Sequence, residues 1–387
     1  MTSRLHIQFH DRLADIDATQ WDALAGPTAP PFTRHAFLTG LEASGSVSAE
    51  QGWEPLHLSA TDDNGALVAA LPLYLKHHSW GEFVFDWAWA DAYQRAGLAY
   101  YPKLVSASPF TPATAERLML ADDCDAPAVA GAVLQAVENV ASSNDLSSIH
   151  LQFLDASGAA HCRARDYVLR KDCQFHWCNQ GYRDFDEFLA TFSSAKRKKV
   201  RRERRRLTEA GIHFEHIAGP ELTAADIDTA FHLTRQTFVI RGREPYLNRD
   251  FFVELVATLP NALHVVFANH GEKRIAAAIF YKSSNTLYGR YWGSDADYHS
   301  LHFETCYYQG IDLAIREGLD VFEPGTQGEH KISRGFLPVE TWSAHWLSHP
   351  TFASAIGDHV ERERAHIDSY MAAVNGHSPY RSDTGSD

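Results

Sequence analysis

One pattern of residues occurs twice in this sequence. Residues 55–76 and residues 262–282 correspond, with one gap, in a Leu-His pair, a turn glycine, an Ala-Ala pair and a closing Tyr and Lys. Each copy consists of an apolar run, a polar turn that contains Asn and Gly, and a second apolar run, which is the pattern of a β-hairpin. A duplicated hairpin constrains the chain to fold as two copies of one module.

The segments that follow the two hairpins correspond as well. In the first copy, residues 128–142 have helical spacing and residues 148–153 have the pattern of a strand. In the second copy, residues 303–317 have helical spacing, and a short strand is predicted at residues 320–323, after the helix stop at Gly318. The order hairpin, helix, strand in both halves predicts an α/β fold with a repeated module.

These elements suggest a division of the chain. We predict a first module over residues 1–170, a second module over residues 171–374 and a disordered polar tail over residues 375–387. Helical spacing predicts further helices at residues 184–192, 194–210, 224–239, 249–258 and 351–373.

Composition excludes several classes of protein. The 387 residues carry a formal net charge of −14 and are 45% apolar, which is typical of a folded domain and not of a disordered chain. No apolar run has the roughly 18 residues of a membrane span, and the first residues lack the apolar core of a signal peptide. Five cysteines do not predict a disulfide framework. We therefore expect a cytoplasmic protein.

Positive charge is concentrated in one segment. Nine of the eleven residues at 196–206 are Lys or Arg, in a chain that is acidic overall. Such a run is either a solvated helix face or a surface for anions, for which the candidates are a CoA pyrophosphate, a nucleic-acid backbone and acidic lipid headgroups. The candidate anion or membrane patch consists of Lys196, Arg197, Lys198, Lys199, Arg201 and Arg202.

Several longer segments resemble the FemAB-like predicted N-acyltransferase family of bacteria. The segments lie at residues 32–47, 76–91, 100–112, 194–211, 302–318 and 323–338. The resemblance covers about residues 30–373 and implies two tandem GNAT-like (acyl-CoA N-acyltransferase) modules in a FemAB-like double-GNAT architecture. One feature departs from the GNAT pattern, because no R/Q-x-x-G-x-G/A loop precedes Phe303, where residues 293–300 read GSDADYHS.

The resemblance implies transfer of an acyl group from an acyl-CoA thioester directly to a primary amine. Acyl-CoA would then be a co-substrate, with no permanently bound cofactor. Some relatives look similar to bacterial ceramide synthases, which implies a long-chain, sphingoid-type base as acceptor, an amide lipid as product and peripheral contact with the inner membrane face. The alternative is an aminoacyl-tRNA-dependent transferase acting on a peptidoglycan precursor or another amine, and only this alternative implies a nucleic-acid partner. A non-enzymatic binding module of the same fold is a third hypothesis.

The strongest concentration of candidate site residues follows the strand predicted at 320–323. Glu323 and His330 are candidates for the base that deprotonates the amine. Gln327 is a candidate to bind a carbonyl or amide, and Lys331 and Arg334, three positions apart, are candidates to hold a donor anion. The alternative is a surface loop with ordinary charges.

Residues 288–293 have the alternation of a central strand. Arg290 and Trp292 fall on one face, where we expect them to contact the donor. Tyr291 falls on the other face as a candidate general acid, although an aromatic residue there is more often part of the core.

Polar residues beside aromatic residues mark a second region, in the first module. Lys76, Glu82, Asp86 and Lys103 are candidates for the acceptor side of the substrate groove, or else form the polar rim of an aromatic core. We expect no metal site. Cys162, Cys173, His176 and Cys178 have the composition of one, but Cys173 and Cys178 would face opposite sides of a strand.

Overall fold

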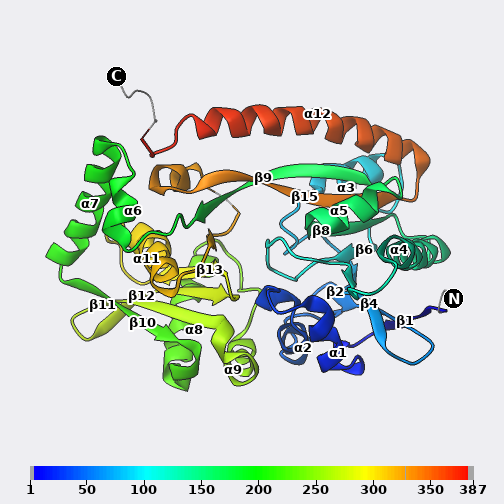
Figure 1. The fold of residues 1–387 in the computed structure, drawn as a ribbon, viewed down its shortest axis with the longest axis horizontal. Coiled ribbons are helices and arrows are strands. Elements are labelled where there is room, and N and C mark those ends of the chain that lie inside the picture. Colours follow the sequence, from blue (N-terminus) through cyan, green and yellow to red (C-terminus); the bar gives the residue numbers. More distant parts are fainter. Residues whose placement is uncertain (1–3, 327, 382–387) are drawn as a thin grey trace. The chain divides into compact units, whose positions relative to one another are not determined.

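The two hairpins seen in the sequence lie in two different units of the chain (Figure 1). The computed structural model describes residues 4–326 and 328–381. One unit comprises the residues up to Asp172 together with Glu340–Asp368, and the other comprises Cys173–Val339 together with the residues from Ser369 onward. We call them the first and the second unit. The module boundaries deduced from the sequence stay a prediction.

In the first unit, the predicted hairpin is formed by β3 (His57–Thr61) and β4 (Leu67–Leu71). These strands belong to a four-stranded sheet of order β1-β3-β4-β7, in which β1 is His6–His10 and β7 is Met119–Leu120. The remaining strands of the unit neighbour one another in the order β15-β8-β6-β5-β2. They are β15 (Leu337–Leu347), β8 (Ser148–Leu154), β6 (Lys103–Ser106), β5 (Tyr74–Lys76) and β2 (Trp53–Pro55).

One sequence expectation is wrong at this hairpin. The sequence predicted a single second strand through residue 76, but the chain leaves the first sheet after Leu71 and pairs again only from Tyr74. Pro72 lies at the break, and proline has no N–H for a strand ladder. The corresponding strand of the second unit lacks a proline and continues unbroken over β12 (Lys273–Lys282).

Helices of the first unit cover these strands. They are α1 (Ala18–Ala25), α2 (His35–Ala43), α3 (Trp87–Arg95), α4 (Ala126–Ser143) and α5 (Ala156–Arg163). The apolar stripe of α4 is buried in the core of the unit together with Leu58, Leu104 and Ile149 of three strands. The helix predicted at residues 128–142 is thus confirmed, as is the strand predicted at residues 148–153.

The second unit is built on strands in the order β10-β11-β12-β13-β14-β9. They are β10 (Ile212–Ala218), β11 (Leu263–His270), β12, β13 (Thr286–Ser294), β14 (Val321–Glu323) and β9 (Val168–Cys178), of which the part from Cys173 belongs to this unit. Helix α8 (Ala224–Val239) packs on β12 and β13, and α9 (Arg249–Thr258) packs on α8. The bounds of α8 and α9 are those that the sequence predicted.

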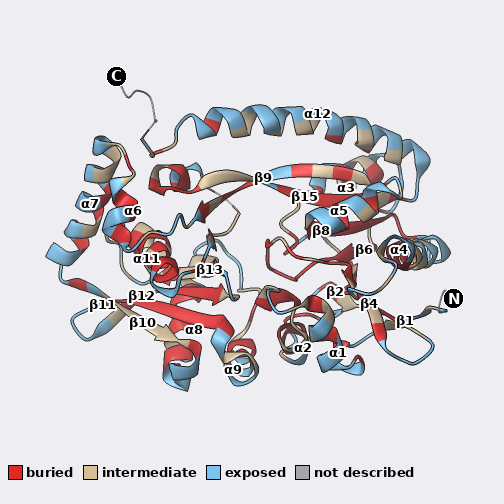
Figure 2. Cartoon of the chain, in the orientation of Figure 1, coloured by how far each residue is buried: buried red, intermediate tan, exposed pale blue. Residues whose placement is uncertain are grey.

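Two further helices of the second unit are α6 (Phe185–Ala190) and the basic helix α7 (Ser194–Glu209), which confirm the helices predicted at 184–192 and 194–210. The long helix α12 (Pro350–Asn375) confirms the helix predicted at 351–373. Figure 2 shows that buried residues follow the strands and that most of α7 is exposed.

The helix predicted at residues 303–317 is not a uniform α-helix. It begins as α10 (Leu301–Phe303), passes through a π-helical turn (Glu304–Tyr308) and continues as α11 (Gln309–Glu317). A π-turn widens the helix locally and often marks a functional site. The carboxylate of Glu304 is buried there and accepts hydrogen bonds from Arg204 Nε at 3.0 Å and Gln309 Nε2 at 2.7 Å.

The described part of the predicted tail is attached to the second unit, because Tyr380 donates a hydrogen bond of 2.7 Å to the carbonyl of Gly335 and packs on Phe192. Residues 382–387 lie outside the described residues. Among the helices formed by described residues, none combines the length and the apolar character that crossing a membrane requires.

Candidate active site

A β-bulge in the second unit sets the position of Arg290. Phe280 of β12 faces Gly289 of β13, whereas the next residue back, Ile279, faces Tyr291. Arg290 is therefore the extra residue of the bulge. Bulges of this kind redirect a side chain and are frequent beside active sites.

Beside the bulge lies a cavity of about 130 Å³. It is lined by Ala278, Ile279, Phe280, Gly289, Arg290, Tyr291, Trp292, His302, Cys306, Tyr307 and Pro324. At about 30 Å³ for each water molecule, it has room for about four waters, which suits the carbonyl end of a donor better than a long chain. The cavity brings together three residues selected from the sequence, Arg290, Tyr291 and Trp292.

The aromatic rings of this strand point as the alternation predicted. The ring of Trp292 lies 5.3 Å from that of His302, whereas the ring of Tyr291 lies 6.0 Å from Phe252 and 6.4 Å from Phe238. Tyr291 thus has the packing of a core residue on the side of α8 and α9. Burial raises the pKa of Tyr291, so its hydroxyl stays protonated.

Arg290 and Glu323 lie side by side. Nη1 of Arg290 donates to the carbonyl oxygens of Gly289 at 2.9 Å and Glu323 at 3.2 Å, and Nη2 lies 3.7 Å from the Glu323 carboxylate. Burial lowers the pKa of Arg290, although the Glu323 carboxylate opposes this. The Glu323 carboxylate therefore faces the Arg290 cation, and its role as a base stays a prediction.

Lys331 and Arg334 contact different groups within the chain, and their binding of a donor anion stays a prediction. Nζ of Lys331 donates to the carbonyl of Gly325 at 2.6 Å, whereas Nη2 of Arg334 lies 3.3 Å from the Glu203 carboxylate. Burial, with Arg290 nearby, lowers the pKa of Lys331 to about 7. Gln327, the third residue selected in this loop, lies outside the described residues.

His330 is connected to the cavity through Tyr307. Its Nε2 lies 2.9 Å from the hydroxyl of Tyr307, which lines the cavity, and the His330 side chain is exposed to solvent. Burial and the nearby Arg334 lower the pKa of His330, so the imidazole is neutral at pH 7 and can accept a proton. Tyr307 was not among the site residues selected from the sequence.

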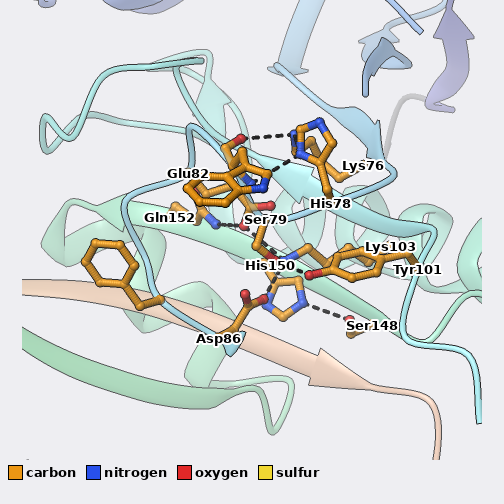
Figure 3. Close-up of polar contacts among 12 residues, drawn as sticks. Lys76, His78, Ser79, Glu82, Asp86, Tyr101, Lys103, Ser148, His150 and Gln152 are labelled. Atoms are coloured by element: carbon orange, nitrogen blue, oxygen red, sulfur yellow. Dashed lines mark hydrogen bonds and ion pairs between the residues drawn. The ribbon is translucent and has the colours of Figure 1, made fainter. Parts of the chain in front are cut away.

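The first unit contains a second polar cluster, drawn in Figure 3. Its centre is Lys103, whose side chain is fully buried. Nζ of Lys103 donates to Ser79 Oγ at 3.0 Å, to Glu82 Oε2 at 3.0 Å and to Asp86 Oδ2. The acceptor residues selected from the sequence are thus brought together, except that Lys76 lies at the edge of the cluster.

The pKa values of Glu82 and Lys76 are shifted toward neutrality, in contrast to that of Lys103 at the centre of the cluster. Burial raises the pKa of Glu82 to about 7, although Lys103 opposes the shift, and burial lowers the pKa of Lys76 to about 7. Nζ of Lys76 lies 3.8 Å above the Trp53 ring and donates to the carbonyl of Trp80 at 3.3 Å. For Asp86, burial alone would raise the pKa, but Lys103 holds it below its ordinary value.

Histidines extend the cluster into the core of the first unit. Tyr100 donates to Asp86 at 2.6 Å and lies 3.3 Å from His150 Nε2, and His150 Nδ1 lies 2.5 Å from His345 Nδ1. Burial lowers the pKa of His150 to about 3. These histidines are 195 positions apart, and no local signal in the sequence connects them.

The basic helix α7 presents most of its cations to solvent. Lys198, Lys199, Arg201, Arg202, Arg205 and Arg206 are exposed, whereas Lys196 and Arg197 are half-buried. Five of the exposed cations line one shallow hollow with Ala195. The inner face buries Val200, Leu207 and Glu203, and the Glu203 carboxylate also accepts a hydrogen bond from Tyr308 at 2.5 Å.

Within residues 4–326 and 328–381, no group of three or more His, Cys, Asp or Glu side chains has the arrangement of a metal site. Cys162 is buried in α5, and burial raises its pKa to about 12.

Several solved structures have a fold similar to that of this chain. FemX matches with a TM-score of 0.55 at 11% identity, over 91% of this chain and 100% of that chain. The C-terminal domain of a putative lysylphosphatidylglycerol synthetase from Agrobacterium fabrum matches with a TM-score of 0.51 at 11% identity, over 89% and 94%. A conserved protein of unknown function from Bacteroides thetaiotaomicron matches with a TM-score of 0.51 at 14% identity, over 88% and 99%. No curated protein matches the sequence.

The family comparison covers nearly the whole chain. A family model named FemAB-like, described as peptidoglycan biosynthesis/recognition, matches residues 12–382. Family and fold together support a transferase of the acyltransferase kind that acts on an amine. The tandem GNAT-like fold expected from the sequence is confirmed. The chain belongs to the FemAB-like family.

Proposed function

We propose that this chain is an N-acyltransferase that moves an acyl group from an acyl-CoA thioester to a primary amine. The observation that carries the proposal is the cavity at the β13 bulge, where a buried arginine lies among aromatic and imidazole side chains. The positive charge of Arg290 suits the oxyanion that forms when an amine attacks a carbonyl.

The reaction needs no covalent enzyme intermediate. The amine nitrogen bonds to the carbonyl carbon, the carbon–sulfur bond breaks, and the thiolate leaves with the electron pair. The proton lost by the amine balances the charge of the thiolate, which leaves as a thiol. The chain therefore has to stabilise the oxyanion and move one proton.

Tyr307 and His330 form the proton route of this proposal. Burial raises the pKa of Tyr307, so its hydroxyl keeps its own proton and relays one by accepting and donating hydrogen bonds. Neutral His330, at the solvent end of this pair, takes up the proton. Lys331, with its pKa near 7, is a second group suited to accept a proton in the same loop.

The buried carboxylates of the first unit supply the acceptor side. Glu82 and Asp86 are the charges that attract an ammonium group, whereas the buried charges beside the cavity of the second unit are mostly cationic. We assign the amine to Glu82 and Asp86, with Lys76 and Lys103 setting their ionisation, and the donor carbonyl to the cavity of the second unit.

A second candidate function is favoured by α7. Its row of exposed cations suits a polyanionic donor, so aminoacyl-tRNA is the alternative to acyl-CoA. Binding through these cations would weaken steeply with salt, in proportion to the number of phosphate contacts. The same face also suits an anionic membrane surface.

The test is a transfer assay with the full chain. Acetyl-, octanoyl- or palmitoyl-CoA is mixed with a set of primary amines, and free thiol and amide are measured by absorbance and mass spectrometry. The proposal predicts equal amounts of thiol and amide with at least one pair. No thiol release with any thioester, together with amide formation from aminoacyl-tRNA, would establish the second candidate instead.

A further inference from the structure

One acidic residue stands inside the basic run of α7. Glu203 is the single carboxylate of residues 196–206, and it is only 4% exposed. Val200, Glu203 and Leu207 recur at the spacing of one helix face, which is the face that α7 buries. A buried carboxylate costs desolvation energy that an apolar side chain at this position would not cost, so its partners indicate why it is there.

The Glu203 carboxylate has partners in two other elements of the second unit. It accepts a hydrogen bond of 2.5 Å from the Tyr308 hydroxyl in the π-turn, and Nη2 of Arg334 lies 3.3 Å from each of its two oxygens. Arg334 is the last residue of a 3₁₀ turn, Glu329–Arg334. One side chain of α7 thus connects the π-turn with this 3₁₀ turn.

The two connected turns carry the proton route. Tyr307, next to Tyr308 in the π-turn, lines the cavity, and His330 lies in the 3₁₀ turn. Nη1 of Arg334 donates to the carbonyl of His330 at 2.7 Å, and the His330 ring rests on Gly328, where a Cβ would lie 2.2 Å from Cε1. The position of the 3₁₀ turn therefore determines whether Nε2 of His330 stays 2.9 Å from the Tyr307 hydroxyl.

We propose that Glu203 is a positioning residue for the proton route: its carboxylate, held by Tyr308, orients Arg334, and Arg334 holds the backbone of His330 so that the imidazole meets Tyr307. This inference rests on the proposed function, because it concerns the proton route of that reaction. It also explains why a carboxylate is buried in the middle of a basic helix.

The first test is steady-state kinetics of the full chain with a thioester and an amine that the wild type uses. Glu203→Gln keeps an acceptor for Tyr308 but removes the charge that orients Arg334. We expect kcat to fall about tenfold with both KM values unchanged, because proton transfer contributes in the transition state and not to substrate binding. Wild-type kcat in Glu203→Gln, or a raised KM with kcat unchanged, would overturn the inference.

Glu209→Gln is the matched control. Glu209 lies on the same helix and pairs with Arg205 at 3.4 Å, but both side chains are exposed. The substitution is chemically the same and should leave kcat and both KM values unchanged, since an exposed ion pair contributes little to structure.

The titration of His330 gives a readout that a purely structural role would not move. Burial lowers the pKa of His330, and the cations Arg334 and Lys331 of its own turn lower it further, while Tyr307 and His302 face it from the neighbouring helix. Without the Glu203 carboxylate, the charge of Arg334 is less compensated, so the pKa of His330 should fall further.

This shift is measured by NMR titration of the imidazole signals, with the His330 signal identified by its loss in His330→Gln. We expect a lower titration midpoint in Glu203→Gln and the wild-type midpoint in Glu209→Gln. A lower kcat in Glu203→Gln with an unchanged midpoint would indicate a structural role alone and would overturn the inference.

A second variant covers a failure to fold. Glu203→Gln leaves Arg334 buried without its carboxylate, whereas the double variant Glu203→Gln/Arg334→Met buries no lone cation. Because Glu203 acts through Arg334, the double variant should have the same kcat and the same His330 midpoint as Arg334→Met alone. A further loss of kcat in the double variant would overturn the inference.

The inference and the proposed function can fail separately. If the wild type transfers no acyl group from any thioester, the proposed function fails, and the NMR titration still tests whether Glu203 acts on His330. Transfer by the wild type, with the same kcat and the same His330 midpoint in Glu203→Gln, would leave the proposed function standing and contradict the inference.

Discussion

Lys103 and Lys331 are both deeply buried, one in each unit, and their surroundings differ. Lys103 of the first unit contacts the carboxylates of Glu82 and Asp86, and although burial alone would lower its pKa, these carboxylates raise it above the ordinary value. Lys331 of the second unit has the carbonyl of Gly325 as its hydrogen-bond acceptor and the cation of Arg290 nearby, and burial lowers its pKa to about 7. One lysine is a fixed charge, and the other is a group that changes charge near neutrality.

The same contrast holds for the two clusters around these lysines. In the first unit, the buried carboxylates suit an ammonium group. In the second unit, Arg290 lines the cavity, and its positive charge suits negative charge such as an oxyanion. The two units thus contain buried clusters of opposite charge.

The largest expected effect is on stability. Lys103→Met would leave two buried carboxylates without their cation and should cost about 3–5 kcal/mol of unfolding free energy. Lys331→Met removes one hydrogen bond to a carbonyl and should cost about 1 kcal/mol. Chemical denaturation of both variants measures the difference, and equal losses would contradict the contrast between the two lysines.

The next effect is on catalysis. Arg290→Met should lower kcat by about 10²–10³-fold, since a charge that stabilises an oxyanion contributes mainly in the transition state. Arg235→Ala, which removes an exposed arginine of the same unit that pairs with Glu244, is the control and should keep full activity. Loss of amine affinity, with kcat unchanged, would place Arg290 on the acceptor side instead.

The proton route predicts a smaller effect with a defined pH dependence. Tyr307→Phe should lower kcat about 10²-fold. In the wild type, activity should fall as pH drops through the pKa of His330, which lies below 6.5, because protonated His330 cannot accept a proton. In His330→Gln this acidic limb should disappear, and its persistence would show that another group takes the proton.

The smallest effect concerns the basic helix. Lys198→Glu/Arg202→Glu changes exposed residues and should alter the unfolding free energy by less than about 0.5 kcal/mol. The same variant should bind acidic vesicles or polyphosphate donors at least about tenfold more weakly at low salt. Unchanged binding of both would identify α7 as a solvated face.

Much of the fold could be predicted from the sequence because the elements have clear periodicity. Helices α8 and α9 were predicted at their observed bounds, and both hairpins were visible as a repeat. Pro72 is a residue that interrupts strands, but the repeat of the hairpin predicted one continuous strand across it. The π-turn could not be predicted, because its polar contacts involve Arg204, about 100 positions away.

The residue types of the candidate site could be predicted from the sequence, but the spatial arrangement of these residues could be predicted only in part. Lys76, Glu82, Asp86 and Lys103 were selected because polar residues stood beside aromatic ones, and the structure shows that their charges are buried. His150 and His345 were missed because strands distant in sequence bring them together. The opposite pKa shifts of Lys103 and Lys331 depend on burial and on neighbours, which composition does not reveal.

In the proposed function, the amine and the thioester are bound by different residues, and two-substrate steady-state kinetics test this separation most directly. The KM of each substrate and kcat are measured for the wild type, Glu82→Gln and Arg290→Lys. We expect Glu82→Gln to raise the amine KM about tenfold and to leave the thioester KM unchanged. We expect Arg290→Lys to lower kcat at least about tenfold and to leave the amine KM unchanged. Changes in the same parameter in both variants, or a thioester KM raised by Glu82→Gln, would contradict this separation.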